Sequence, residues 1–487
     1  MSSQGVEPDD VGVLKGLDGA ATTTSYWYLA LLACIGGFLF GYDTAVIGSV
    51  LDFIPYELSD LATGYLVAGA SLGAAVGALG AGPLTDRFGR KSLLMVDAGI
   101  FALGSILSAL TVNAEMLLVS RTLIGLAVGA GSAIATAYIA EFAPSKKRGQ
   151  LSIIQQWMIT VGILASFLIA LFIFKVAPEH AHGADWRIIL GLGAVPALIA
   201  VVLRARMPES PRWLMSKGRY GDTKDALGLL GIEVTEDEVR RTADRIAELE
   251  GKKEPNTSQW TKGVKRALAV VCGFFVFQQI TGINIPFYYG PRLLSDFFDG
   301  ASNSDVESAM AGLQAAAILG TVNVVATYFG FRYIDRLGRR KLALGGFAGM
   351  VIFMVVAAIG TAWLTGAPKT AMVMIGFSFF ITSFAIGVGG TGWLVQGEVF
   401  PTAVRGRAAA IAASVNWLAN FALIVAYPTL NSAFGLAWVM MLFVVLSIMA
   451  MVFVWRFLPE TKNLSVEEVV AVFERQATGT KANALEP

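Results

Sequence analysis

The sequence predicts an all-α membrane protein with twelve transmembrane helices in two six-helix halves. Three observations support this fold class. The 487 residues are 55% apolar and only 15% charged, the apolar residues gather into runs long enough to cross a bilayer, and three charged motifs recur at one spacing. A soluble domain has neither this composition nor a mean hydropathy of +0.63. We therefore expect the apolar surface to face lipid along most of the chain.

A transmembrane helix needs about 20 predominantly apolar residues. Residues 1–25 are polar and lack the basic-then-apolar pattern of a cleavable signal peptide, so we expect the first span to act as its own signal. Runs of the required kind cover approximately residues 27–50, 62–82, 92–112, 116–139, 151–174, 186–205, 264–290, 309–331, 342–364, 370–396, 407–430 and 434–457.

Charge in the short loops predicts the orientation. Loops on one side carry 13 basic residues, whereas the opposite loops carry only Lys175, Arg187, Arg292 and Lys369 together with several acids. By the positive-inside rule the basic loops are cytoplasmic. An even number of spans then places both termini in the cytoplasm of a cell-membrane protein.

The longest polar stretch lies between the sixth and seventh spans, on the same side as the basic loops, and has the pattern of short amphipathic helices. We expect it to form a small cytoplasmic helical domain. The predicted organisation is a cytoplasmic N-terminal tail (1–25), an N-terminal six-helix half (26–206), the helical linker (207–263), a C-terminal six-helix half (264–458) and a cytoplasmic C-terminal tail (459–487).

Internal repetition is the most informative feature of the sequence. DRFGRK at 86–91 recurs as DRLGRR at 335–340, EFAP at 141–144 as EVFP at 398–401, and PES at 208–210 as PET at 459–461. All three offsets are close to 250 residues, which is about half the chain and much longer than the period of a solenoid repeat. Two similar halves with a site at their interface are typical of secondary transporters.

The charged motifs lie where helices meet the cytoplasmic surface. Arginines and carboxylates at such positions can form bidentate ion pairs that latch one half against the other. Positive charge that merely sets topology is the alternative, but topology alone does not require the Asp-Arg-x-Gly and Glu-x-x-Pro spacings. The predicted latch residues are Asp86, Arg87, Arg90, Glu141, Arg148, Glu209, Asp335, Arg336, Arg339, Arg340, Glu398, Arg405 and Glu460.

Together, segments 86–91, 141–149, 208–214, 335–340, 398–406 and 459–462 resemble the sugar porter family of the major facilitator superfamily. The resemblance extends over about residues 25 to 465, with Asn463 as a small departure where the last motif often ends in Gly. It implies two six-helix bundles, a cytoplasmic helical domain, alternating access and a monosaccharide substrate. Both bacterial proton-coupled glucose and xylose symporters and facilitative glucose transporters are similar.

A sugar offers hydroxyls with apolar faces between them, so its site favours amides and aromatic rings over ions. The seventh span contains Gln278, Gln279 and Asn284 around Gly282 and Pro286, where we expect the helix to break and expose backbone to a cavity. In the eleventh span, Asn416 and Asn420 share a face beside Trp417. Such residues can also be interhelical contacts only, but their clustering favours a binding site.

The resemblance assigns these positions more finely. Ala385 stands where the glucose facilitators carry Glu, and Gly390 and Gly392 stand where they carry Pro. Asn416 is like the glucose carriers, whereas the bacterial proton-xylose symporter has Gln there, so D-glucose is the expected sugar. The implied sugar contacts are Gln156, Gln278, Gln279, Asn284, Asn323, Trp393, Asn416 and Trp417, and the implied extracellular gate is Tyr288 and Tyr289.

Asp43 lies well inside the first span, where an unpaired carboxylate is costly and usually functional. Arg121, near the start of the fourth span, is the expected partner. The pair could be a static packing contact. The resemblance favours proton coupling, because the proton-xylose symporter has Asp at this position and mammalian facilitators have Asn. We therefore expect proton symport, with facilitative uniport as the alternative.

Other function classes find little support. The sequence has no G-x-x-x-x-G-K-[ST], H-E-x-x-H or G-x-S-x-G motif, and its two histidines, His180 and His182, lie in a polar loop without a ligand cluster. We expect no enzyme activity, cofactor or metal, and a net charge of +1 gives no reason for nucleic-acid binding. A membrane sugar sensor is a second alternative, although the C-terminal tail is short. The expected partners are a monosaccharide, a proton and lipid, with the monomer as the functional unit.

Overall fold

The computed structural model describes residues 13, 24–142, 148–251, 260–295, 304–462, 464 and 466–478. At some helical positions, including Arg148, Asp335 and Arg336, it describes the backbone alone. Every regular element within these ranges is a helix.

The described chain contains twelve helical segments that are long and apolar enough to cross a membrane, which agrees with the predicted number. In the N-terminal half they are α2 (Thr24–Val50), α3 (Asp60–Phe88), α4 (Arg90–Ala109), α5 (Ala114–Phe142), α6 (Arg148–Val176) and α7 (Trp186–Gly191) with α8 (Ala194–Ala205). In the C-terminal half they are α12 (Lys262–Ile280), α15 (Asp305–Leu337), α16 (Arg339–Trp363), α17 (Gly366–Phe384) with α18 (Gly390–Val399), α19 (Thr402–Phe434) and α20 (Leu436–Phe457).

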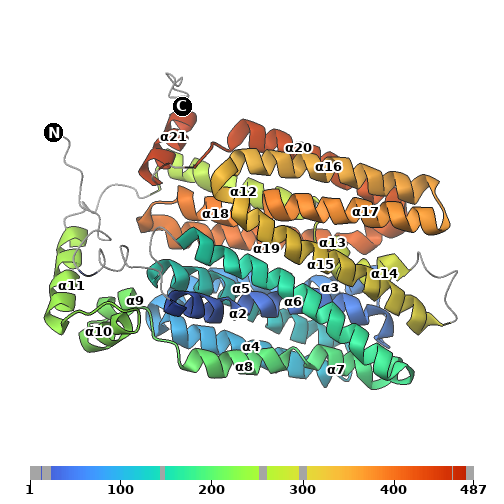
Figure 1. Cartoon of the computed structure of the whole chain (residues 1–487), viewed down its shortest axis with the longest axis horizontal. Coiled ribbons are helices and arrows are strands. Elements are labelled where there is room, and N and C mark those ends of the chain that lie inside the picture. The colour runs from blue at the N-terminus through green and yellow to red at the C-terminus, as the bar shows by residue number, and fades with distance from the viewer. Residues whose placement is uncertain are drawn as a thin grey trace.

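The two halves lie side by side with their helices nearly parallel to one long axis (Figure 1). They meet along two helix pairs, α3 with α19 and α6 with α15. Small residues permit the close approach, because a side chain at Gly64 of α3 would collide with the backbone of Val425 on α19. The fold is therefore the predicted pair of six-helix bundles.

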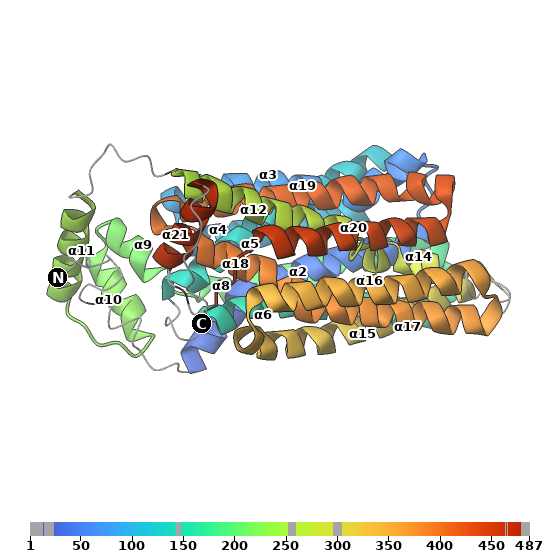
Figure 2. The ribbon, with the colours of Figure 1, turned by 90° about the horizontal axis from the view of Figure 1, so that it is seen from above.

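Three short helices, α9 (Pro211–Ser216), α10 (Tyr220–Gly228) and α11 (Glu236–Gly251), follow the N-terminal half and lie beyond one end of the bundle (Figures 1 and 2). We call this the linker end, and the other the opposite end. Helix α11 begins with a capping box, in which Thr235 Oγ1 accepts from the Glu238 amide at 3.3 Å and Glu238 Oε2 accepts from the Thr235 amide at 2.8 Å. The C-terminal helix α21 (Val466–Thr478) also lies at the linker end, against α12.

The sides of the bundle expose large apolar residues, as a lipid-facing surface requires. Three of its tryptophans lie near helix ends: Trp363 and Trp438 at the opposite end are 77% and 73% exposed, and Trp455 toward the linker end is 63% exposed. Indole rings are enriched where hydrocarbon meets headgroups. These positions therefore indicate the two borders of the membrane band.

A buried ion pair holds the N-terminal half together at a place that the sequence analysis does not assign. Arg204 Nη1 on α8 donates to Asp97 Oδ1 on α4 at 2.8 Å, and both side chains are buried. Arg204 also donates to the carbonyl of Leu94, to that of Leu32 at 3.3 Å and to that of Ala33 at 3.1 Å. One guanidinium thus joins α8 to α4 and α2.

We predict that Arg204→Met will lower the free energy of unfolding of the purified protein by about 3–5 kcal/mol, because it leaves the Asp97 carboxylate buried without its counter-ion. Unfolding in detergent, followed by intrinsic fluorescence, measures the effect. Arg206→Met is the matched control, since Arg206 is exposed. Adding Asp97→Asn to Arg204→Met should recover part of the loss. Equal stability of the two Met variants would contradict the prediction.

Candidate functional site

A cavity lies between the two halves, midway along the spans, and the space within it and at its opening is about 770 Å³. Its wall combines α2 and α6 of the N-terminal half with α12, α15, the α17–α18 segment and α19 of the C-terminal half. The cavity therefore lies at the interface between the two repeated halves.

The seventh span breaks where Gly and Pro predict it. Helix α12 ends at Ile280, Gly282 has a φ of +87°, and the short helix α13 (Ile285–Tyr288) begins with Pro286 in its first turn. A side chain at residue 282 would collide with the Phe443 ring. The break turns Asn284 toward Gln279 across the cavity wall.

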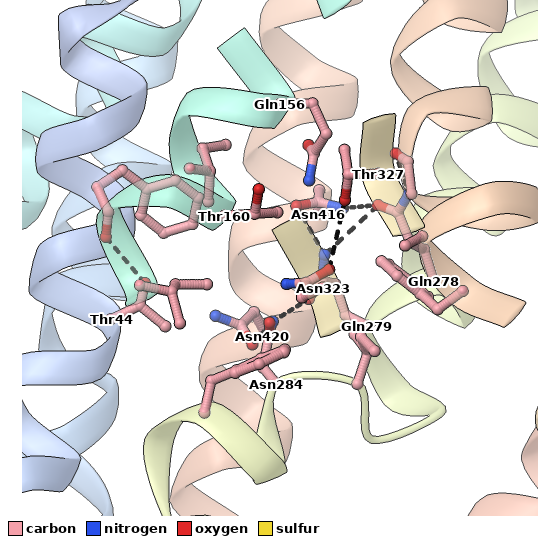
Figure 3. A pocket seen from close by; sticks show the side chains of 18 of the residues that line it. Thr44, Gln156, Thr160, Gln278, Gln279, Asn284, Asn323, Thr327, Asn416 and Asn420 are labelled. Carbon is pink, nitrogen blue, oxygen red and sulfur yellow. Dashed lines mark hydrogen bonds between the residues drawn. The ribbon is translucent and has the colours of Figure 1, made fainter. Parts of the chain in front are cut away.

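The amides form a connected network at this break (Figure 3). Asn284 Nδ2 donates to Gln279 Oε1 at 2.7 Å and to Asn420 Oδ1 at 2.8 Å. Gln279 Nε2 donates to Asn416 Oδ1 at 3.2 Å, and Asn416 Nδ2 donates to Gln278 Oε1 at 2.9 Å. Because each amide fixes the next, the cavity presents donors and acceptors in set directions.

The tenth span contains a π-helical segment, η5 (Ala385–Gly389), beside this network. Gln278 Nε2 donates to the carbonyls of Val388 and Gly389, each at 3.1 Å. A π-segment disturbs the regular backbone ladder and is frequent at functional sites. Here the side chain from α12 pairs with backbone carbonyls at the end of that segment, and Ala385 itself lines the cavity.

Aromatic rings and further amides complete the wall. Trp417 packs edge-on against Phe40 with ring centroids 4.8 Å apart, and Trp393 packs on Phe275 at 4.8 Å. Within the described chain the buried indole N–H of Trp417 has no hydrogen-bond partner. It is therefore a donor available to a bound molecule.

All eight residues predicted to contact sugar line this one cavity: Gln156, Gln278, Gln279, Asn284, Asn323, Trp393, Asn416 and Trp417. The polar lining residues absent from the predicted set are Thr44, Thr160, Thr327 and Asn420. Spacing identifies Asn420, which follows Asn416 by one helical turn. The threonines carry no comparable signal in the sequence.

Tyr288 and Tyr289, the predicted gate, do not line the cavity but lie on the opposite-end side of it. Both are buried, and the Tyr289 hydroxyl donates to the carbonyl of Ile424 on α19 at 3.0 Å. The Tyr289 ring lies 4.8 Å from that of Tyr427. The backbone of Tyr288 presses on Gly48 of α2, where a side chain would collide with its carbonyl.

An ion pair joins the two halves beyond these tyrosines. Arg292 Nε, on the short helix α14 (Gly290–Ser295), lies 3.3 Å from Asp52 Oδ1, which follows α2. The Ser432 hydroxyl of α19 also donates to Asp60 of α3, at 3.3 Å. The halves are thus in contact at the opposite end.

Asp43 and Arg121 form an ion pair inside the N-terminal half, and both side chains are buried. Arg121 also reaches the carbonyl of Asp43 at 3.5 Å and that of Leu66 at 3.4 Å. The pair lies outside the cavity, but Thr44, the next residue along α2, lines it.

The charged motifs of the N-terminal half form one cluster at the linker end. Arg90 Nε donates to Glu141 Oε1 at 3.0 Å, and Arg90 Nη2 lies 3.2 Å from Asp86 Oδ1. The Glu209 carboxylate accepts from the amides of Arg90 and Lys91 at 2.9 and 3.1 Å and so caps α4. Burial raises the pKa of the Glu141 carboxyl, and the Arg90 guanidinium acts in the opposite direction.

The C-terminal half repeats the arginine–glutamate pair and the capping glutamate of this cluster. Arg339 Nη2 donates to Glu398 Oε1 at 2.7 Å, as Arg90 does to Glu141. Glu460 accepts from the amides of Arg339 and Arg340 at 2.8 and 3.2 Å and so caps α16, as Glu209 caps α4. The internal repeat predicted from the motifs is therefore present in the side-chain contacts.

The remaining predicted latch residues lie around these clusters. Arg87 stacks on its neighbour Phe88, Arg405 donates to the carbonyl of Phe400 at 3.1 Å, and Arg340 Nη2 donates to that of Trp455 at 2.6 Å. The side chains of Arg148, Asp335 and Arg336 lie outside the described part of the chain.

The described ion pairs of these two clusters each lie within one half. Arg90 pairs with Asp86 and Glu141, and Arg339 pairs with Glu398. These pairs hold helix ends together inside each half. A latch between the halves stays a prediction.

Known proteins share this architecture. The family model described as "Sugar (and other) transporter" matches residues 29–473. A glucose transporter of Staphylococcus epidermidis is 34% identical over 93% of this chain and 98% of its own. An arabinose-proton symporter of Bacillus subtilis is 34% identical over 91% of this chain and 95% of its own.

Solved structures agree. A partially occluded inward-open form of the xylose transporter XylE from E. coli has a TM-score of 0.78 and 27% identity, covering 91% of this chain and 100% of that one. The proton:xylose symporter XylE bound to 6-bromo-6-deoxy-D-glucose has a TM-score of 0.76 and 28% identity, covering 92% of this chain and 99% of that one. With the repeated halves, the broken seventh span and the family match over most of the sequence, the chain belongs to the sugar transporter family of the major facilitator superfamily.

Proposed function

We propose that the protein is a proton-coupled monosaccharide symporter of the cell membrane, with D-glucose as its sugar, and that it works by alternating access. The observation that carries the proposal is the neutral, amide-lined cavity between the halves, one residue along α2 from the buried Asp43–Arg121 pair. Relatives named as a glucose transporter and an arabinose-proton symporter support the same class.

The chemistry of the wall favours a neutral polyol. Seven of its residues are Asn or Gln and two are Trp, and none of the described lining residues is charged. Sugar hydroxyls both donate and accept, as amides do, and an indole ring suits the apolar face of a pyranose. Leaving such amides unpaired is costly, so a ligand without hydroxyls would be rejected.

The Asp43–Arg121 pair supplies a site for one proton. When a proton binds the Asp43 carboxylate, the negative charge disappears and Arg121 loses its counter-ion, so the guanidinium can turn to other acceptors. When the proton leaves, the ion pair re-forms. A proton that binds from one side and leaves to the other, in step with the sugar, couples the two fluxes.

Both ends of the bundle have roles in this cycle. We assign the linker end to the cytoplasm because it carries the basic loops, which places both termini there. The contacts at Tyr288, Tyr289 and Arg292 then close the extracellular side. The linker-end clusters would bias the equilibrium between inward-facing and outward-facing conformations.

The whole proposal can be tested by measuring sugar-induced proton uptake into proteoliposomes with a series of hexoses and pentoses. Uptake of sugar with protons supports symport, and D-glucose should give the largest signal. Sugar flux without proton movement would make the protein a facilitative uniporter. Binding without flux would favour a sensor.

We predict that Asp43→Asn will exchange labelled sugar across the membrane but will not concentrate it, because the amide mimics the protonated acid permanently. Its transport should lose most of its pH dependence. Counterflow and active uptake in proteoliposomes measure the two properties. Asp97→Asn, in the other buried pair, should still concentrate sugar. Accumulation by Asp43→Asn at the level of the parent protein would defeat the assignment.

We predict that Gln279→Ala and Asn416→Ala will each weaken sugar binding by about 1–3 kcal/mol, since sugar hydroxyls lose their partners in a desolvated site. Titration of the intrinsic fluorescence with sugar in detergent gives the affinity. Gln396→Ala serves as the control, because this buried amide of α18 does not line the cavity. Unchanged affinity in both site variants would place the sugar elsewhere.

We predict that Glu398→Ala will slow transport while leaving the sugar affinity in detergent largely unchanged. The carboxylate binds Arg339 and the Thr461 hydroxyl and does not contact the cavity, so its loss alters the conformational equilibrium. Initial flux rates and equilibrium binding are compared, with exposed Glu115→Gln as the control. Lost binding in a normally folded variant would be evidence against this role.

A further inference from the structure

Three basic residues lie on the C-terminal half where α16 begins and α20 ends, at the linker end of the bundle: Arg340, Lys341 and Arg456. We propose that these residues, here called the basic patch, bind the headgroup of an anionic phospholipid whose acyl chain follows α20. They neither line the sugar cavity nor contact the Asp43–Arg121 pair. The inference therefore goes beyond the proposed transport and does not depend on it.

Packing of two helices brings these charges to one edge of the bundle. Helices α16 and α20 lie side by side (Figures 1 and 2). Arg340 Nη2 donates to the carbonyl of Trp455 at 2.6 Å. The Arg340 guanidinium thus lies at the last turn of α20, next to the residue that precedes Arg456.

Within the described chain no carboxylate pairs with the side chains of the basic patch. The Arg340 guanidinium has the Trp455 carbonyl as its one described acceptor, and its Nε has none. Arg456 is exposed, and its guanidinium carbon lies 5.5 Å from the Phe457 ring centroid. Lys341 is exposed as well. Most N–H groups of the patch therefore lack an acceptor in the described part of the protein.

The start of α16 does not itself provide an anion site. Glu460 caps it, and the two oxygens of its carboxylate accept from the amides of Arg339 and Arg340 at 2.8 and 3.2 Å. A negatively charged ligand would therefore bind through side chains and not through the helix terminus. Glu460 adds one negative charge beside the three positive charges of the basic patch, so this surface keeps a net positive charge.

The internal repeat does not account for this surface. Alignment of the PES motif with the PET motif places Trp455 opposite Arg204 and Arg456 opposite Ala205. Arg204 turns inward to Asp97 and is buried, whereas Trp455 and Arg456 are both exposed. The scaffold that the two halves share therefore does not require an exposed indole and an exposed arginine at this place.

An exposed apolar row on α20 leads to the basic patch. Its members follow one another at steps of one, three or four residues along one face of the helix, and they are between 41% and 63% exposed: Val445, Ile448, Met449, Val452 and Trp455. The row ends at the Trp455 indole, which lies at the border of the membrane band. A phospholipid has the same order of groups, with acyl chains in the hydrocarbon region and phosphate at its surface.

The donors of the basic patch match a phosphate group. A guanidinium presents paired N–H groups to phosphate oxygens, and a lysine adds a point charge. Basic pockets between transmembrane helices bind anionic headgroups, and each basic residue near the surface strengthens the attraction by about 5-fold. Phosphatidylglycerol has a net negative charge, whereas the ammonium group of phosphatidylcholine compensates its phosphate. The patch should therefore prefer the anionic lipid.

The test is native mass spectrometry of the purified protein in detergent, titrated with phosphatidylglycerol or with phosphatidylcholine. The parent protein should bind phosphatidylglycerol more tightly, by about 10-fold or more. Arg340→Gln combined with Arg456→Gln should weaken phosphatidylglycerol binding by about 25-fold and leave phosphatidylcholine binding unchanged. Arg456→Gln alone removes no hydrogen bond of the described chain. It should weaken binding by about 5-fold, and it replaces the double variant if that variant does not fold.

Lys91→Gln combined with Arg206→Gln is the matched control, because it removes two positive charges from the same end of the other half. Lys91 corresponds to Arg340 in the repeated motif, and Arg206 is exposed directly after α8. This control should keep the parental affinity for phosphatidylglycerol. The lipid should also raise the unfolding temperature of the parent and of the control more than that of the Arg340→Gln/Arg456→Gln variant.

Four results would overturn the inference. Parental affinity in the variants of Arg340 and Arg456 would place the lipid elsewhere. An equal loss in both double variants would show diffuse attraction of anionic lipid to the basic linker end, without a site. Equal affinity of the parent for the two lipids would show that headgroup charge is not recognised. Release of phosphatidylglycerol by excess inorganic phosphate would identify a site for a free anion, since an acyl chain along α20 should keep the lipid bound.

Discussion

Polar groups inside a bilayer have no water to bind, so each must find a partner within the protein, and this constraint determines where the helices depart from regularity. The break after α12 exposes backbone and amides, and the side chains from α12, α13 and α19 pair with one another around it. The carbonyls of Val388 and Gly389 at the end of the π-segment η5 also need donors, and the side-chain amide of Gln278 donates to both. The cavity is thus the place where these irregularities meet, and under the proposed function a sugar replaces some of the pairings with its own hydroxyls.

The same constraint explains the symmetry at the linker end. Each half has a glycine with positive φ, Gly89 at 94° and Gly338 at 89°, directly before a helix whose first amides lack internal partners. In each half a glutamate carboxylate lies against this helix start, Glu209 beside Gly89 and Glu460 beside Gly338. A Cβ on either glycine would collide with that carboxylate. The glycine and the glutamate of each motif therefore form one unit. This accounts for the repetition of spacings that positive charge alone would not require.

Much of the fold follows from the sequence because hydropathy and repetition are local or periodic signals. The twelve spans and the break at Gly282 and Pro286 are of this kind. Partner choice is different, since it depends on which helices become neighbours. Nothing near Asn420 in the sequence indicates Ser71, 349 positions away, and the pairing of Arg90 with Glu141 inside one half, rather than across the interface, is set by packing. The rule that singles out Asp43 as a carboxylate inside a span applies equally to Asp97, whose partner Arg204 could be inferred only once α4 and α8 were known to be neighbours.

The two buried pairs have the same chemistry but different surroundings, and this difference supports the proposed role of Asp43 and Arg121. Arg204 keeps three backbone carbonyls besides Asp97, and all of its partners belong to one half. The Arg204 guanidinium is therefore held from several sides, and a change in the relative position of the halves would leave its hydrogen bonds unchanged. Arg121 has only two longer contacts to carbonyls besides the Asp43 carboxylate, at 3.4 and 3.5 Å, so its state depends mainly on the charge of one residue. In the proposed alternating access the halves move against each other, and Thr44, the residue after Asp43 in α2, lines the cavity between them. A pair with few alternative partners close to that cavity can respond to a proton, whereas a pair with many partners deep inside one half holds helices in place.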